Sequence, residues 1–219
     1  ENDKSVFYTS LYRTYERMIN ISEDGRYYSA FDCKVHDDNG IPFYTDDWIW
    51  DTYRATHPLR VLIEPEIECD MISSYIRMAE QTPQGWMPTF PEVTGDSHRM
   101  NGNHAIAVIW DAYSKGLTNF SLERAYEACQ KAIMEKTLLP WQKLPLTELD
   151  KFYHKNGFFP ALHLGEAETC QEVHNGEKRQ AVAVTLGDCY DKWCLAQTAK
   201  SLHKEQDYKL YLKDSYAYR

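Results

Sequence analysis

Apolar side chains recur at helical spacing in several separate stretches of the chain. In residues 5–19, for example, Val6, Leu11, Tyr15 and Ile19 fall on one side of a helix. Apolar residues three or four positions apart are typical of an amphipathic helix. Similar stretches occupy residues 48–56, 66–80, 100–115, 122–140, 146–155, 180–202 and 206–219. The pattern therefore predicts an all-α fold.

Glycine, proline and small polar residues mark the ends of these stretches. Pro58 indicates a helix start or a kink, Gly116 a C-terminal cap, and Asn119 or Ser121 the N-cap of the next helix. Residues 22–46 contain Glu-Asp-Gly-Arg, Asp-Asp-Asn-Gly and Ile-Pro around a short aromatic run, which predicts a loop region with one small hairpin. We therefore expect only minor β-structure, confined to loops.

The length of 219 residues corresponds to one globular domain or to part of a larger one. Residues 206–219 are still in helical register where the sequence ends, and they contain no stop signal. We therefore interpret residues 1–219 as a single segment of a longer domain.

The charge balance and the hydropathy argue against two classes of partner. Lys and Arg number 24 against 33 Asp and Glu, for a net charge of −9, and the basic residues form no stripe. Proteins that hold a phosphate backbone need such a stripe, so nucleic acid is not expected as a partner. The longest apolar run, residues 105–110, is far shorter than the roughly 20 residues of a membrane-spanning helix. No transmembrane segment is expected either.

Six cysteines, at positions 33, 69, 129, 170, 189 and 194, show no spacing of a zinc or thioredoxin-like motif. A chain of this length builds a core without disulfides, so buried free thiols are favoured over a disulfide framework. Residues 1–10 lack the basic start and the apolar run of a signal peptide. Either the protein is intracellular or its N-terminus has been removed.

Aromatic, acidic and basic side chains gather in the segment 44–57. They are Trp48, Trp50, Asp51, Arg54 and His57. The helical spacing of Asp47, Asp51 and Arg54 predicts that these three share a face. Aromatic rings stack on the apolar side of a pyranose while charged groups bind its hydroxyls, so this set is typical of a sugar site. The alternative is an aromatic core helix with a structural Asp–Arg pair.

A second cluster runs from His98 through Arg99, Asn103 and His104 into an apolar helix. Free amides at the start of a helix, together with these polar side chains, can bind a substrate oxygen or an anion. The alternative is that Asn101 and Asn103 cap the helix and that His104 is a satisfied core histidine.

A third cluster contains Glu172 and Glu177 before the stretch 181–187. Such carboxylates can act in acid–base catalysis, but they can equally complement the dipole at a helix start. The sequence contains no nucleophile elbow, dinucleotide-binding turn, phosphate-binding loop or His-Glu-x-x-His helix. Nucleotide cofactors and serine hydrolysis therefore lose support.

Seven motifs, taken in order, resemble glycoside hydrolase family 92, the calcium-dependent exo-acting α-mannosidases. They are residues 7–14 (FYTSLYRT), 25–27 (GRY), 50–59 (WDTYRATHPL), 85–88 (GWMP), 102–105 (GNHA), 157–160 (GFFP), and 178–186 (KRQAVAVTL) with 190–193 (YDKW). The resemblance extends over nearly the whole chain. It implies that these residues form the front part of an (α/α)6 toroid built from helical hairpins, without the family's β-sandwich domain and without the rest of the toroid.

The resemblance also implies a chemistry, namely inverting hydrolysis of a terminal α-1,2-type mannosyl linkage by two carboxyl groups. In the family the general acid lies in a Glu-Gly-Asn segment and the general base in a Gly-Asn-Asp-Asp segment, and neither occurs among these residues. The calcium ligands cannot be assigned to positions here. Substrates of the family are mannose-containing glycans, and a periplasmic or cell-surface location follows from the resemblance alone.

In this scheme the segment supplies substrate recognition. Asp51 is expected to accept hydrogen bonds from mannose hydroxyls, with Trp50 and Arg54 beside it. Weaker candidates are Trp48, His57, Arg99, Asn103 and His104. The segment alone is expected to be inactive, and it needs the remainder of its catalytic domain as partner. The alternatives are a non-catalytic helical module that binds carbohydrate or protein, and a different toroid glycosidase, lyase or epimerase.

Overall fold

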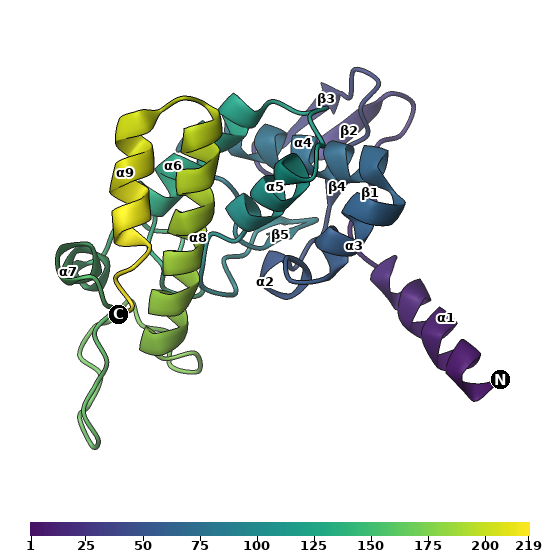
Figure 1. Cartoon of the computed structure of the whole chain (residues 1–219). Coiled ribbons are helices and arrows are strands. Elements are labelled where there is room, and N and C mark those ends of the chain that lie inside the picture. The colour runs from purple at the N-terminus through teal and green to yellow at the C-terminus, as the bar shows by residue number, and fades with distance from the viewer.

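The computed structural model describes residues 1–219 and contains nine helices and three small two-stranded sheets (Figure 1). The helices are α1 (Asn2–Thr14), α2 (Ile49–Thr52), α3 (Thr56–Ile63), α4 (Pro65–Glu80), α5 (Ala105–Ser114), α6 (Leu122–Glu135), α7 (Glu148–Asn156), α8 (Ala181–Ser201) and α9 (Glu205–Asp214). The expectation of a mostly helical fold with strands in loops is confirmed.

The strands pair only locally and antiparallel. They are β1 (Ile19–Asn20) with β4 (Tyr44–Thr45), β2 (Arg26–Ser29) with β3 (Lys34–Asp37), and β5 (Pro91–Glu92) with β6 (Gly95–Asp96). The β2–β3 pair is the small hairpin predicted within residues 22–46. The β5–β6 pair lies between α4 and α5 and, as shown below, leads into the candidate site.

The main core lies among α4, α5, α6 and α8. Small residues of α5 and α6, such as Ala105, Ala112, Ala125 and Ala132, are fully buried and allow the helices to approach closely. In Figure 1, α8 and α9 run side by side as a helical hairpin, and α8 also packs against α5 and α6. Because α5 and α8 meet at their N-terminal halves, the loops that precede them are brought together.

The ends of several helices follow from local sequence signals. Ser121 caps α6 by accepting a hydrogen bond from the Arg124 amide, so the N-cap is Ser121 and not Asn119. Thr147 and Asp150 form a capping box at the start of α7, and Gly157 ends that helix with φ +82°. Gly116, with φ +95°, follows α5 in the left-handed conformation expected of a C-terminal cap.

Some of the predicted helices are shorter than their apolar pattern. The first ends at Thr14, so Ile19 belongs to a strand, and none of the residues in α1 is buried. Residues 100–104 are loop, α6 ends at Glu135, and α9 ends at Asp214 before a turn. Residues 48–56 form only the single turn α2 followed by the start of α3. Residues 101–104 and 136–139 are buried although they are not helical, so an apolar pattern shows which residues are buried better than it shows where a helix begins and ends.

Several helices expose apolar side chains, most extensively α1 and α8. In α1, Phe7, Tyr8 and Tyr12 are exposed, and Figure 1 shows this helix projecting from the body. Val182 and Leu186 lie one turn apart on the uncovered side of α8. None of the helices combines the length and the apolar character that a bilayer crossing requires. Of the cysteines, Cys33 is exposed and Cys170 half-buried, so the expectation of buried thiols is wrong for Cys33.

Candidate functional site

One buried residue, Asp47, holds the short helix α2 in place through its backbone and its carboxylate. Asp47 lies just before α2 and is almost wholly buried. Its backbone N–H donates to the Pro91 carbonyl at 2.8 Å, and the Thr52 hydroxyl donates to Asp47 Oδ1 at 2.9 Å. Both ends of the single helical turn are therefore held by Asp47.

The same carboxylate belongs to a buried ionic cage around His57, at the start of α3. His57 Nε2 lies 3.1 Å from Asp47 Oδ2, and His57 Nδ1 lies 2.9 Å from Glu68 Oε1 on α4. The Tyr75 hydroxyl donates to Asp47 Oδ2 in addition. With His57 2% exposed and Glu68 0% exposed, the cage excludes solvent. It joins the α2 segment to α3 and α4.

The charges of the cage stabilise one another. Burial by itself disfavours the charged imidazole, but Glu68 and Asp47 outweigh this and raise the pKa of His57 to about 10. Burial also opposes ionisation of Asp47, yet His57 and the hydroxyl donors keep the pKa of Asp47 below its ordinary value. At neutral pH, His57 is thus an imidazolium between two carboxylates, with a proton on each ring nitrogen.

The opposite side of α2 faces solvent and carries the polar and aromatic set. The Arg54 guanidinium lies 4.9 Å from the centre of the Trp50 ring and 5.1 Å from that of Tyr53, and its Nε donates to the Tyr53 hydroxyl at 3.1 Å. Asp51 is exposed at the edge of a cleft of about 180 Å³ that also contains Arg13 and Arg17. Burial raises the pKa of Asp51, and the nearby charge of Asp47 adds to the increase.

Trp48 is held between two guanidinium groups. Arg17 lies 3.8 Å from the centre of the Trp48 ring and is paired with Asp46 at 2.6 Å. Arg99 approaches the same ring at 5.9 Å, and Phe90 stacks beside it at 5.7 Å. Since these groups cover the indole, Trp48 is a structural neighbour of the cleft.

The predicted polar cluster before α5 is buried except for Arg99, whose side chain is 38% exposed. The Asn103 N–H donates to Asp191 Oδ2 at 2.8 Å, and His104 Nδ1 lies 2.8 Å from Asp191 Oδ1 on α8. The ring of Tyr53 stacks on His104 at 4.3 Å, which connects this pair to the α2 segment. Neither asparagine caps α5, because the Asn101 side chain donates to Gln180 and α5 has no side-chain cap.

Several loop residues around this surface adopt the left-handed backbone conformation although they are not glycine. They are Asp46, His98, Trp141, Lys178 and Gln180, with φ between +47° and +66°. Contacts link them into one region, since the Trp141 N–H donates to the His98 carbonyl and Asn101 bonds Gln180. Such conformations cost of order 1–3 kcal/mol and concentrate at functional sites. They lie in the loops before α2, α5, α7 and α8.

The structure divides the eight predicted site residues into two groups. Trp50, Asp51 and Arg54 form one accessible set; Trp48 lines the same cleft as Asp51, and Arg99 contacts the Trp48 ring. His57, Asn103 and His104 are at most 4% exposed and lie beneath that surface. The predicted common face of Asp47 and Asp51 is wrong, because Asp47 precedes the helix and points inward.

Sequence reasoning also missed residues that complete the region. Arg17 and Tyr53 contact the predicted set directly; Tyr53 lies within the motif 50–59, and Arg17 lies within the predicted helix 5–19. Trp141 had no signal, because an isolated tryptophan in a loop follows no pattern. The third cluster does not form an acid–base pair: Glu172 is exposed, and Glu177 accepts a hydrogen bond from Gln180 Nε2 at 2.6 Å.

The residues of this chain do not fit a calcium site. No group of three or more His, Cys, Asp or Glu side chains is placed to hold a metal ion. Asp47 and Glu68, the carboxylates closest to such an arrangement, already have an imidazolium between them. Calcium prefers six to eight oxygen ligands, so this nitrogen-centred cage is unsuitable.

A family model for the glycosyl hydrolase family 92 catalytic domain matches residues 1–219. Among solved structures, the family GH92 alpha-mannosidase BT3965 from Bacteroides thetaiotaomicron superposes with a TM-score of 0.79 and 28% identity, covering 99% of this chain and 26% of its own. Its complex with mannoimidazole gives 0.78 and 28%, over 97% and 25%. The GH92 inverting mannosidase BT2199 from B. thetaiotaomicron VPI-5482 gives 0.75 and 31%, over 97% and 27%.

No curated protein sequence matches the chain. The chain spans about a quarter of the length of the matched structures. These matches confirm the fold expected from the seven motifs, a helical part of an (α/α)6 toroid.

Proposed function

Because the chain belongs to glycosyl hydrolase family 92, we propose that it forms part of the substrate-binding surface of an exo-acting α-mannosidase. The substrate class is a glycan with a terminal α-linked mannose, and the reaction is hydrolysis of that linkage. A role in recognition, and not in bond cleavage, is supported by the side chains present: the accessible set contains one carboxylate, and an inverting enzyme needs two carboxyl groups roughly 6.5–9.5 Å apart.

The observation that carries this proposal is the exposed set on α2. Asp51 offers two carboxylate oxygens that accept hydrogen bonds from neighbouring sugar hydroxyls, and the Trp50 indole offers an apolar ring. Arg54 packs on that ring at 4.9 Å and keeps it in place. The partial burial that raises the pKa of Asp51 also strengthens the hydrogen bonds that its ionised form accepts.

The remaining predicted residues lie beneath or beside Trp50, Asp51 and Arg54 and hold the segments around them in place. The His57 cage fixes the turn that presents Asp51, while Asn103 and His104 bind Asp191 and thereby join the loop before α5 to α8. The Arg99 guanidinium contacts the Trp48 ring and so joins the loop before α5 to the cleft that contains Asp51. In our proposal these residues orient the sugar-binding groups and do not contact the terminal mannose.

The finer features follow from the family. We propose α-1,2-type linkages as substrates, a periplasmic or cell-surface location, and the remainder of a family 92 catalytic domain as the partner that supplies the general acid, the general base and the calcium ligands. The exposed apolar side of α8, with Val182 and Leu186, is a surface that such a partner can cover.

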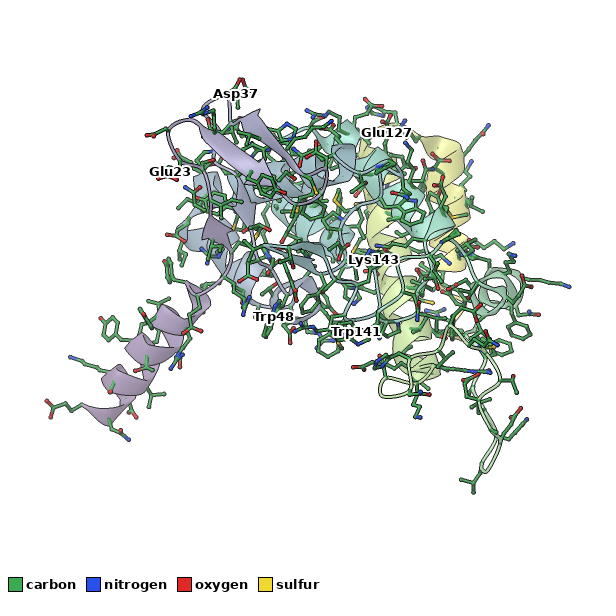
Figure 2. All side chains as sticks on the ribbon, turned by 180° about the vertical axis from the view of Figure 1, so that it is seen from behind. Glu23, Asp37, Trp48, Glu127, Trp141 and Lys143 are labelled. Carbon is green, nitrogen blue, oxygen red and sulfur yellow. The ribbon has the colours of Figure 1, made fainter.

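Replacement of Asp51 tests the proposal. In an enzyme that contains this segment, Asp51→Asn should lower kcat/KM for a terminal mannoside about 10- to 100-fold, the value of one or two hydrogen bonds to a charged group. Asp37→Asn is the matched control, because Asp37 is exposed at the far side of the molecule from Trp48 (Figure 2). Equal kcat/KM values for Asp51→Asn and Asp37→Asn would remove Asp51 from the site.

A further inference from the structure

Trp141 combines exposure with an unfavourable backbone conformation. Its side chain is 40% exposed, and its φ of +66° is rare for a bulky residue. The conformation is held by a hydrogen bond from the Trp141 N–H to the His98 carbonyl at 2.5 Å. A large apolar ring normally gains free energy by burial, but this ring is placed at the surface at a conformational cost.

Neighbouring side chains fix the orientation of the Trp141 ring. The Arg99 guanidinium lies 5.2 Å from the ring centre and is itself paired with Glu92 at 3.0 Å. The His174 ring lies 5.8 Å away, tilted by 32°. A ring held in this way loses little conformational freedom when a ligand binds to it.

His174 adds a hydrogen-bond donor beside the indole. Its Nδ1 accepts hydrogen bonds from the backbone N–H groups of Gly176 and Glu177, both at 3.2 Å. With Nδ1 acting as the acceptor, the neutral ring carries its proton on Nε2. The side chain is exposed, so this N–H is available to a ligand hydroxyl.

The Trp141 ring belongs to the same surface as the α2 set. Arg99 contacts the rings of both Trp141 and Trp48, and Trp48 lines the cleft that contains Asp51. In Figure 2, Trp48 and Trp141 lie along the same edge of the molecule, and Asp37 lies at the opposite edge. One arginine therefore separates the exposed indole from the cleft.

We propose that Trp141 is a stacking platform for a second sugar ring of the bound glycan, a neutral hexopyranose next to the terminal mannose. The indole contacts the apolar C–H face of that ring, and His174 Nε2–H donates to one of its hydroxyls. This inference rests on the proposed function, because it places the terminal mannose at Asp51. It extends the binding surface to the loops before α7 and α8.

Affinities for one and two sugar rings test the platform. The binding of methyl α-mannoside and of α-1,2-linked mannobiose would be measured by titration calorimetry on an enzyme that contains this segment, with its general acid substituted so that mannobiose is not cleaved. Trp141→Asn removes the ring, and asparagine tolerates the left-handed conformation, so the backbone is preserved. This variant should bind mannobiose about tenfold more weakly than the wild type, an effect of about 1.4 kcal/mol, with unchanged affinity for the monosaccharide.

Two further variants separate stacking from general effects. Trp141→Tyr retains an aromatic face and should recover most of the mannobiose affinity. Trp193→Ala is the matched control, because Trp193 is exposed to a similar extent, 37% against 40%, but stacks on Tyr190 along α8. It should bind both sugars as the wild type does. Thermal unfolding of each variant shows that the fold is retained.

Three results would overturn the platform. If wild type and Trp141→Asn bind mannobiose equally while both bind the monosaccharide, the platform is refuted and the role of Asp51 stands. If Trp141→Asn loses affinity for both sugars to the same extent, the ring does not contact a second sugar. If Asp51→Asn binds both sugars as the unsubstituted enzyme does, the proposed function fails and the platform, which rests on it, fails too.

Discussion

Replacing His57 by leucine should destabilise the chain severely. The substitution leaves Asp47 and Glu68 buried without their shared cation, and Glu68, which is 0% exposed, has no other hydrogen-bond partner. Breaking a buried ion pair in this way costs about 3–5 kcal/mol. Tyr75 and Thr52 still donate to Asp47, so we expect about 3 kcal/mol, at the lower end of that range.

Urea unfolding at pH 7 measures this loss directly. A loss of about 3 kcal/mol corresponds to a fall in Tm of about 6–12 °C for a chain of this size. His36→Leu is the control, because His36 pairs with Asp32 at 3.0 Å but is 28% exposed. A partly exposed pair contributes about 1 kcal/mol or less, so the control should change the free energy of unfolding by no more than that.

The same experiment repeated across pH tests the charge on His57. The pKa of His57 is raised from 6.5 to about 10 in the folded chain. A raised folded-state pKa gives stability that is fully present below pH 6.5 and is lost as the pH rises towards 10. The wild type should therefore lose stability over this range, and its advantage over His57→Leu should shrink. A loss below about 1 kcal/mol at pH 7, or a constant gap up to pH 10, would refute the cage as described.

Two further substitutions or modifications check other parts of the structure. Gly102→Ala would place a Cβ 2.6 Å from His104 Nε2 at φ +90°, so it should cost more than Gly165→Ala, which has the same type of φ but open space; we expect a difference of at least about 1 kcal/mol in urea unfolding, and equal losses would contradict the close contact. Cys33 is exposed whereas Cys194 is buried and burial raises its thiol pKa, so a thiol reagent should modify Cys33 rapidly in the folded chain and Cys194 only on unfolding; similar rates would contradict this packing.

The sequence predicted helices most accurately where one face of the helix is apolar and the other is polar. Residues 66–80 correspond closely to α4, because their apolar residues are buried by α5 and α6 and their ends carry Pro65 and polar residues. The stretch 5–19 has similar periodicity, but α1 has no neighbouring helix that buries it. Periodicity shows which side chains of a segment can be buried. Whether they are buried depends on a neighbouring element, and only the tertiary structure provides that element.

The candidate site shows the same division. The helical spacing of Trp50 and Arg54 placed them in contact, as the structure shows, whereas the role of Trp50, Asp51 and Arg54 in sugar binding stays a prediction. The spacing argument failed for Asp47, since a helix that begins at Ile49 does not set the direction of a residue before it. Trp141 was missed for another reason: the sign of its φ depends on the His98 carbonyl, which is 43 positions away in sequence and is brought near only by folding.

The pairing of His104 with Asp191 has a consequence for how the chain folds. It joins positions 87 residues apart, whereas α8 and α9 form a hairpin between neighbours in sequence. Hairpins between neighbouring elements form quickly. Pairs that are distant in sequence form more slowly, because closing the long loop between them costs conformational entropy. The loops before α5 and α8 thus depend on contacts of high sequence separation, and detachment of the α8–α9 hairpin from α5 would separate these loops while leaving the hairpin itself intact.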